Sequence, residues 1–152
     1  MLRQARVTDV PAIHALIARF ADEGRMLPRS RARLYEMVRD FLVAESEDGG
    51  GVVAVGALRT LWEDWGEICS LAVAEEHKGK GLGTSIVENL LGQAALLGLR
   101  RVFVLTFVPK YFKRFGFKGT PKNRLPHKVW ADCVNCPKFP DCGEHALVRE
   151  LL

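Results

Sequence analysis

A glycine-rich segment in the middle of the chain has residue types and a spacing suited to binding phosphate. Its sequence is Lys78-Gly79-Lys80-Gly81-Leu82-Gly83-Thr84. Glycine lets the backbone approach an anion without interference from a Cβ atom, and the first N–H groups of a helix have no partners within the helix. The alternating glycines match neither the P-loop nor the Gly-x-Gly-x-x-Gly dinucleotide motif. The segment therefore predicts a different anion-binding loop, or else a glycine-rich turn with two solvated lysines.

The elements on either side of this loop are expected to be a strand and a helix. Residues 67–73 are typical of a strand, and residues 84–97 of a helix that ends in a left-handed C-cap at Gly98. The apolar stripe of this helix comprises Ile86, Leu90, Ala94 and Leu97. The loop would then lie at a helix N-terminus, where the helix dipole favours negative charge.

The rest of the chain alternates between strand and helix periodicity. We expect further strands at residues 2–7, 52–58 and 102–107. Two helices follow the first of these strands, one capped by Thr8 or Asp9 and the other by Ser30. Their apolar stripes are Ile13, Leu16, Ile17 and Phe20 in the first helix, and Leu34, Met37, Val38 and Phe41 in the second. This alternation of strands and helices predicts an α/β fold.

The composition favours one compact globular domain over residues 1–152. Of its 152 residues, 48% are hydrophobic and 26% are charged, which argues against disorder, collagen or a coiled coil. No apolar run approaches the roughly 18 to 20 residues that a membrane span needs, and residues 1–6 lead into no apolar signal segment. We therefore expect a cytoplasmic protein.

The charge is distributed unevenly along the chain, whose net charge is +4. Residues 1–99 hold 11 basic and 14 acidic side chains, a balance of −3, and residues 100–152 hold 11 basic and four acidic ones, a balance of +7. A basic C-terminal third suits nucleic acid, a membrane surface or a small anionic ligand, and charge alone does not choose among these.

A cysteine-rich segment over residues 132–145 has the spacing of a metal site. Its Cys-x2-Cys-x5-Cys-x2-His pattern could supply four zinc ligands, Cys133, Cys136, Cys142 and His145. The alternatives are a disulfide or redox pair and ordinary buried or solvated cysteines. Cys69 stands alone in an apolar stretch and is expected to be a small core residue.

The glycine-rich loop and its flanks resemble a known family. Leu71-Ala72-Val73 followed by Lys78-x-x-Gly81-x-Gly83 is similar to the acetyl-CoA motif of the GNAT superfamily of N-acetyltransferases, and Phe112-x-x-x-Gly116-Phe117 resembles its closing helix and Gly-Phe turn. The resemblance implies a mixed, mostly antiparallel sheet flanked by helices and split near the strands at Glu67 and Val102 to admit acetyl-CoA. It also implies that the backbone N–H groups from Lys78 to Thr84 hold the CoA diphosphate, and that the backbone at Leu71 and Val73 pairs with pantetheine and polarises the thioester carbonyl.

Transfer of an acetyl group from a thioester to a neutral amine needs a proton acceptor. Glu67 is the candidate, because it opens the strand that would carry the carbonyl-binding backbone. Strand alternation would place it on one face with Cys69, Leu71 and Val73. The alternative is an ordinary solvated carboxylate at a strand end.

One position departs from the family pattern. Many members place a Tyr four residues before the Gly of the Gly-Phe turn, where it protonates the departing CoA thiolate, and this chain has Phe112 there. Tyr111 is adjacent but points about 100° away around a helix, so it is not a simple substitute. The general acid is therefore unassigned, and both aromatic side chains could serve only in packing.

The acceptor amine is suggested by the segment before the second helix, Leu27-Pro28-Arg29-Ser30-Arg31-Ala32-Arg33. The helix dipole disfavours cations at a helix start. These arginines therefore indicate either a binding site for an anionic ligand or exposed charges that only keep the surface soluble. With residues 66–73 and 104–106, this segment resembles the acetyltransferase domain of N-acetylglutamate synthase, which acetylates the α-amine of L-glutamate. The resemblance implies Arg29 as a ligand of a substrate carboxylate, with Lys113 or Arg114 as helpers.

The sequence thus predicts a short, stand-alone acetyl-CoA-dependent N-acetyltransferase that acts on L-glutamate in arginine biosynthesis. Transfer would be direct, in a ternary complex. Neither a nucleic acid nor a membrane is expected as a partner, and the oligomeric state, monomer or homo-oligomer, is left open. One alternative is an acetyltransferase acting on another small amine or on a protein amine. The other is a non-enzymatic basic module that binds nucleic acid or protein.

Overall fold

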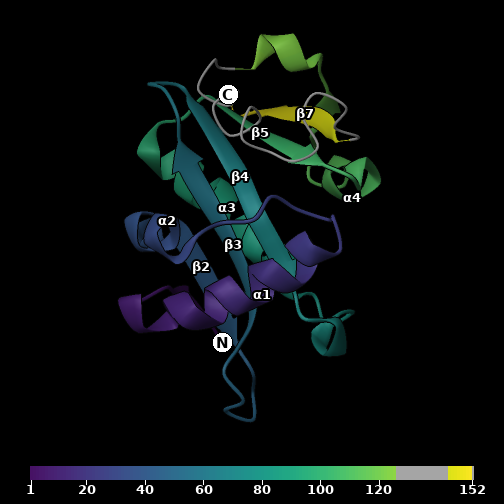
Figure 1. Cartoon of the computed structure of the whole chain (residues 1–152). Coiled ribbons are helices and arrows are strands. Elements are labelled where there is room, and N and C mark those ends of the chain that lie inside the picture. Colours follow the sequence, from purple (N-terminus) through teal and green to yellow (C-terminus); the bar gives the residue numbers. More distant parts are fainter. Residues whose placement is uncertain (126–143, 152) are drawn as a thin grey trace. The chain divides into compact units, whose positions relative to one another are not determined.

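The computed structural model describes residues 1–125 and 144–151 (Figure 1). Its helices are α1 (Val10–Asp22), α2 (Arg31–Glu36), α3 (Leu82–Leu97) and α4 (Pro109–Lys113), with short 3-10 turns η1 (Val7–Asp9), η2 (Val38–Asp40), η3 (Glu75–His77) and η4 (Lys122–Arg124). Its strands are β1 (Leu2–Gln4), β2 (Phe41–Glu45), β3 (Val52–Thr60), β4 (Trp65–Val73), β5 (Arg101–Thr106), β6 (Lys118–Gly119) and β7 (His145–Glu150). None of the helices in the described part of the chain is long and apolar enough to span a bilayer.

The strands form a mixed, mostly antiparallel sheet, as expected. Their hydrogen-bonded order is β1-β2-β3-β4-β5-β7-β6. The pairs β1–β2, β2–β3, β5–β7 and β6–β7 are antiparallel, and β4–β5 is parallel. The chain divides into two compact units, one of residues 1–58 and 70–90, the other of residues 59–69 and 91–152.

The first unit is built on β1, β2 and β3, with α1 and the first half of α3 on opposite sides of β2 and β3 (Figure 1). The predicted apolar stripe of α1 is confirmed as buried: Ile13, Leu16, Ile17 and Phe20. The predicted cap of the second helix is also confirmed, because Ser30 Oγ accepts a hydrogen bond from the Arg33 N–H at 3.1 Å. That helix is shorter than expected, since α2 ends at Glu36 and Phe41 begins β2.

Close approach of α3 to β3 in this unit requires a glycine at position 56. A Cβ atom added to Gly56 would lie 2.6 Å from Cγ2 of Ile86 and 3.2 Å from Cδ1 of Leu71. Ile86 is fully buried, so its side chain has little room to move away. Gly56 therefore sets how closely the helix that follows the glycine-rich loop packs on the strands.

We expect Gly56→Ala to lower the free energy of unfolding by about 1–3 kcal/mol, the usual cost of overpacking a core. Gly92→Ala is the matched control, because Gly92 lies in α3 with no atom within 4 Å of an added Cβ, and alanine there should stabilise the helix by up to about 1 kcal/mol. Urea denaturation of both variants measures the difference. If both substitutions change the free energy of unfolding in the same direction, the close packing of α3 on β3 is contradicted.

An ion-pair network ties β1 to the start of α1 and the end of β2. Both guanidinium Nη atoms of Arg3 donate to the carboxylate of Asp9, at 2.8 and 2.9 Å, and Nη2 also donates to Glu45 at 2.8 Å. The backbone N–H of Arg6 donates to Asp9 at 2.7 Å. Asp9, one of the two expected capping residues, is the N-cap of α1, but its side chain makes no capping bond to α1 and turns to Arg3 and Arg6 instead.

Stability should depend on the ionisation of Asp9. The hydrogen bonds from Arg3, and after them the one from Arg6, hold the pKa of Asp9 below its ordinary value of 3.8. The unfolded chain therefore binds the proton first, so the contribution is complete above about pH 4 and is lost as the pH falls through the folded-state pKa. We expect Asp9→Asn to lower the free energy of unfolding by about 1–3 kcal/mol at pH 7. This gap in unfolding free energy between the variant and the unaltered chain should narrow at acid pH. A gap that is constant from pH 7 to pH 2.5 would contradict this.

The second unit is built around β5. All six residues of β5 pair with β7, from Arg101 opposite Glu150 to Thr106 opposite His145, and β6 pairs with the far side of β7. Phe103 is fully buried in this unit, next to the edge of the Trp65 ring at a centroid distance of 5.8 Å. Neither β6 nor β7 was among the expected strands.

The helix after the glycine-rich loop was predicted with the correct end, Leu97, and a small error at its start. It begins at Leu82, two residues earlier than expected. The predicted left-handed C-cap is confirmed, because Gly98 has a φ of 86°. Ile86, Leu90 and Ala94 are buried, but Leu97 is 65% exposed. The assignment of Leu97 to the buried stripe is therefore wrong.

Candidate active site

The glycine-rich loop leads directly into α3 and leaves backbone donors available. Gly79 and Gly81 adopt left-handed φ values of 81° and 80°, and a Cβ added to either would meet no atom within 4 Å. The first bond of α3 runs from the Ser85 N–H to the Gly81 carbonyl at 3.0 Å. The N–H groups of residues 82–84 therefore have no acceptor within the helix. This arrangement suits an anion that lies against exposed backbone.

The Lys78 side chain turns back from the loop. Its ammonium donates to Glu75 at 3.0 Å and lies 5.4 Å from the centre of the Phe20 ring. Lys80 is exposed. Lys78 is also at the surface, with 41% of its side chain exposed, so the alternative of two solvated lysines still stands, although the Lys78 ammonium has definite partners.

Glu67 is buried and paired with a residue that the sequence did not single out. Glu67 and Arg59 are each 6% exposed, Arg59 Nε donates to Glu67 Oε1 at 3.0 Å, and Nη2 donates to the same oxygen. The alternative of a solvated strand-end carboxylate is wrong. The tight connection in which the Leu61 N–H bonds the Trp65 carbonyl at 3.0 Å brings Arg59 opposite Glu67. Recognising that turn in the sequence would have revealed Arg59.

The strand that carries Glu67 is irregular just beyond it. The β4–β5 pairing covers three residues and ends at Glu67 opposite Phe103. Three residues later, Ser70 has a left-handed φ of 55°, which is uncommon for a residue other than glycine. The expected alternation from Glu67 to Val73 is therefore wrong as a regular pleat. Leu71 and Val73 are half-buried, as is Cys69, which was expected in the core.

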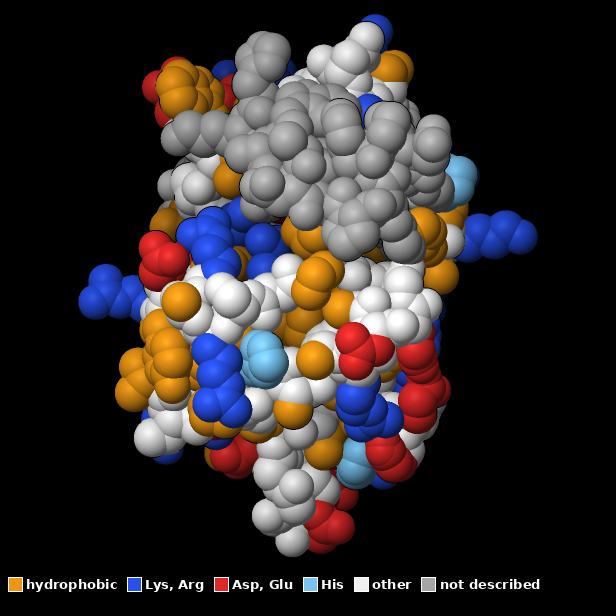
Figure 2. Space-filling model, in the orientation of Figure 1, with side chains coloured by type: hydrophobic (Ala, Val, Ile, Leu, Met, Phe, Trp, Pro, Cys, Tyr) orange, Lys and Arg blue, Asp and Glu red, His pale blue; other side chains and the backbone are white. Residues whose placement is uncertain are grey.

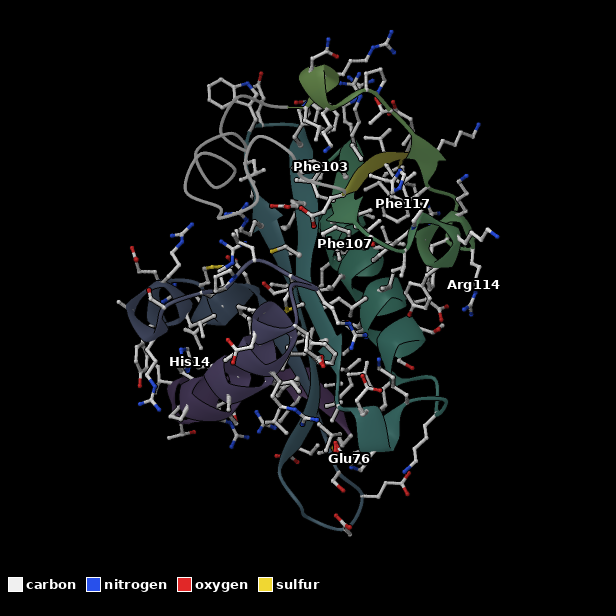
Figure 3. All side chains as sticks on the ribbon, turned by 45° about the vertical axis from the view of Figure 1, so that its right-hand side comes forward. His14, Glu76, Phe103, Phe107, Arg114 and Phe117 are labelled. Atoms are coloured by element: carbon white, nitrogen blue, oxygen red, sulfur yellow. The ribbon has the colours of Figure 1, made fainter. Side chains whose placement is uncertain are left out.

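The candidate acceptor residues differ in their surroundings. Arg29 is half-buried between α1 and α2, whereas Arg31 is exposed. Lys113 at the end of α4 and Arg114, which caps that helix, are both exposed, and Arg114 points outward (Figure 3) with its guanidinium 5.3 Å from the centre of the Tyr111 ring. Arg29 belongs to the first compact unit, and Lys113 and Arg114 belong to the second.

Phe112 fills the position of the expected acid and serves in packing. It is buried, with the Tyr111 ring edge-on at 5.2 Å and the Phe117 ring at 5.7 Å. Tyr111 is half-buried. Gly116 has a φ of 86°, and Arg149 from β7 donates to the neighbouring Phe115 carbonyl at 2.7 Å. The helix and Gly-Phe turn are thus present where the resemblance placed them.

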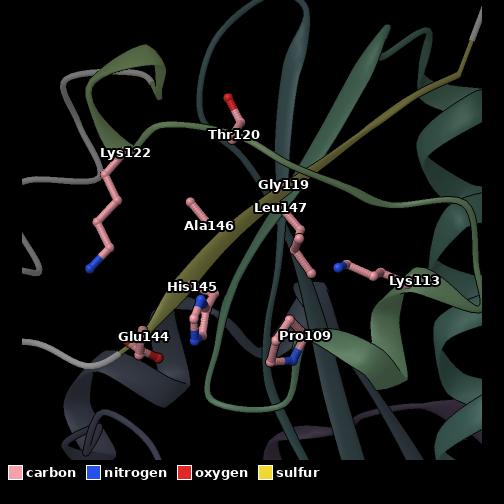
Figure 4. Close-up of a pocket in the computed structure, with 9 residues that line it drawn as sticks. All are labelled: Pro109, Lys113, Gly119, Thr120, Lys122, Glu144, His145, Ala146 and Leu147. Carbon is pink, nitrogen blue, oxygen red and sulfur yellow. The ribbon is translucent and has the colours of Figure 1, made fainter.

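The proposed zinc ligands are only partly within the described structure. Cys133, Cys136 and Cys142 lie outside the described residues. His145 is exposed at the start of β7 and, with Lys113, lines a pocket of about 420 Å³ (Figure 4). Across residues 1–125 and 144–151, no group of three His, Cys, Asp or Glu side chains is placed to hold a metal ion.

Comparison with known proteins places the chain in a family. Residues 10–117 match the acetyltransferase (GNAT) family. An uncharacterized N-acetyltransferase of Chlorobaculum tepidum is 41% identical over 99% of this chain and 96% of its own length. An amino-acid acetyltransferase of Mycobacterium tuberculosis is 46% identical over 80% of this chain and 71% of its own.

A solved structure of N-acetylglutamate synthase from Neisseria gonorrhoeae, complexed with coenzyme A and N-acetyl-glutamate, matches with a TM-score of 0.89 and 30% identity. The match covers all of this chain and 35% of the synthase, so this chain spans about a third of that enzyme. The chain belongs to the acetyltransferase (GNAT) family and is an acetyl-CoA-dependent N-acetyltransferase close to the amino-acid acetyltransferases.

Proposed function

We propose that this chain transfers the acetyl group of acetyl-CoA to the α-amine of L-glutamate, with residues 1–152 acting as one acetyltransferase domain. The observation that carries the proposal is the match to a synthase complexed with coenzyme A and N-acetyl-glutamate. The half-buried Arg29 supports it, because a guanidinium binds carboxylates through paired hydrogen bonds.

The proposed site has three parts. The backbone N–H groups of Lys78, Gly79, Lys80, Gly81, Leu82, Gly83 and Thr84 bind the CoA diphosphate, and the backbone at Leu71 and Val73 binds pantetheine and the thioester carbonyl. Arg29, with Lys113 or Arg114, binds the carboxylates of the acceptor. Glu67 is the general base, and its pair with Arg59 fixes the carboxylate in place.

The reaction in this site is a direct transfer. The neutral α-amine attacks the thioester carbonyl, the C–N bond forms, and the C–S bond breaks as the CoA thiolate leaves. Glu67, or a water that it orients, takes the proton that the amine loses. Phe112 has no proton to donate, so the thiolate is protonated by water or by another residue.

The test is CoA release from acetyl-CoA with L-glutamate, L-glutamine, other amino acids, polyamines and short peptides as acceptors. We expect the largest kcat/KM with L-glutamate. Turnover that is largest with an uncharged amino acid, a polyamine or a peptide would contradict glutamate as the acceptor and leave the acetyltransferase class intact.

Arg29→Met tests the carboxylate ligand. We expect it to raise the KM for L-glutamate by about 10-fold or more, the loss of a charged hydrogen bond, with the KM for acetyl-CoA little changed. Arg31→Met removes the same charge two residues away from an exposed position, and should change neither KM by more than about twofold. Equal effects of the two substitutions would remove Arg29 from the site.

A further inference from the structure

The carboxylate of Glu75 lies between two cations at the entrance to the glycine-rich loop. Its Oε1 accepts from Nζ of Lys78 and from Nη1 of Arg25, each at 3.0 Å. Over η3, acidic and basic side chains lie next to one another on the surface (Figure 2, lower right). The hydrogen bond from Arg25, and after it the one from Lys78, holds the pKa of Glu75 below its ordinary value of 4.5. Glu75 is thus a carboxylate shared by α1's C-terminal side and the start of the loop.

Both cations also lie over the same aromatic ring. Arg25 Cζ is 4.5 Å and Lys78 Nζ 5.4 Å from the centre of the Phe20 ring. Phe20 is 5% exposed on the buried face of α1, so the ring is a fixed surface. Attraction between a cation and a ring face adds to the ion pairs. The Lys78 ammonium is therefore held from two sides.

The residues that follow Lys78 offer little side-chain packing of their own. Gly79, Gly81 and Gly83 have no side chains, and an added Cβ at Gly79 or Gly81 would lie in open space. Lys80 is exposed. The side chain of Lys78 is consequently well placed to fix the N-terminal end of the loop, while α3 fixes the other end.

We propose that Glu75 is a positioning residue for the loop: with Phe20, it holds the ammonium of Lys78 against α1 and so keeps the loop backbone ready for the CoA diphosphate. This inference rests on the proposed assignment of the loop to CoA. Lys78 acts through its contacts with Glu75 and Phe20. A direct role as diphosphate ligand would require the ammonium to leave both partners.

The test compares Glu75→Gln with Glu76→Gln. Glu76 (Figure 3) lies on the same short turn, and its carboxylate contacts Arg19 at 3.5 Å rather than Lys78. Each substitution removes one negative charge beside the loop, so the long-range electrostatic change is matched. We expect Glu75→Gln to raise the Kd for CoA and the KM for acetyl-CoA about two- to fivefold over Glu76→Gln, the range of an exposed ion pair, with kcat unchanged and an unaltered melting temperature.

If Lys78 instead binds the diphosphate directly, its release from Glu75 would lower the KM in Glu75→Gln. Equal Kd values in the two variants, or a lower Kd in Glu75→Gln, would overturn the proposal. The combination Glu75→Gln with Lys78→Met gives an independent check. Because both act through one contact, the pair should weaken CoA binding no more than Lys78→Met alone, and multiplied effects would contradict this.

Phe20→Leu separates the ring from the carboxylate, because leucine keeps the buried apolar volume largely filled. We expect it to raise the Kd for CoA about two- to threefold.

If the proposed assignment of the loop to CoA is itself wrong, the result is different. The unaltered chain would then show no CoA binding by calorimetry, which overturns both the proposed site and this inference. Normal CoA binding with no difference between Glu75→Gln and Glu76→Gln overturns the inference alone.

Discussion

Glu67→Gln is expected to lower kcat for acetyl transfer by about 100-fold or more while the Kd for CoA stays the same. Glutamine has nearly the shape of glutamate and cannot accept the proton that the amine loses. The effect should therefore fall on turnover and not on cofactor binding. Steady-state kinetics with saturating acceptor, together with calorimetry of CoA binding, measures both quantities.

Burial of Glu67 adds a second consequence that must be separated from the first. Glutamine leaves the guanidinium of Arg59 buried without its carboxylate, and removal of one partner of a buried ion pair typically costs about 3–5 kcal/mol. A thermal melt of the variant is thus part of the experiment, and kcat is to be compared at a temperature where the variant is fully folded.

Arg59→Lys is the control, because it weakens the same ion pair and leaves the carboxylate in place. Lysine keeps the charge but cannot offer both Nε and Nη2 to Oε1. We expect it to lower stability with a much smaller loss of kcat than Glu67→Gln. If Glu67→Gln retains kcat within about threefold, or if the two variants lose kcat equally, Glu67 is not the base.

The parts of the fold that the sequence predicted are those fixed by local pattern. The stripe of α1, the Ser30 cap and the left-handed Gly98 follow from helix periodicity and from the preferences of residues at helix ends. Leu97 shows the limit of periodicity. The apolar spacing of α3 continues for about a turn beyond Ala94, the last residue of the predicted stripe that is buried. Local pattern states which face of a helix is apolar, not how far the neighbouring elements cover it.

The details of the candidate site depend on register, which local pattern does not reveal. The loop and the position of Glu67 could be found from residue types and a family resemblance. The partnership with Arg59 arises only when the β3–β4 connection places residues eight apart opposite each other. Serine is not a residue type that predicts a left-handed φ, so the irregularity of β4 at Ser70 could not be predicted from the sequence. Similarly, the contact of Lys78 with Phe20 joins positions 58 residues apart and follows from tertiary packing.

Gly81→Ala is expected to weaken CoA binding by about 10- to 100-fold and to lower the free energy of unfolding by about the backbone strain alone. An alanine at a φ of 80° carries about 1–2 kcal/mol of strain, and its Cβ meets no atom of the folded chain within 4 Å. In the proposed site, the diphosphate lies against this backbone, so the same Cβ would obstruct the ligand or turn the N–H groups away from it. Calorimetry with CoA measures the effect directly.

Gly98→Ala isolates the ligand from the strain. Gly98 has a φ of 86° and no atom within 4 Å of an added Cβ, but it follows the C-terminal end of α3, away in sequence from the loop. The two substitutions therefore carry a similar backbone penalty, and their melting temperatures should fall by similar small amounts. Only Gly81→Ala should lose affinity for CoA. If both variants bind CoA as the unaltered chain does, the glycine at position 81 serves the turn alone and the loop does not hold the diphosphate.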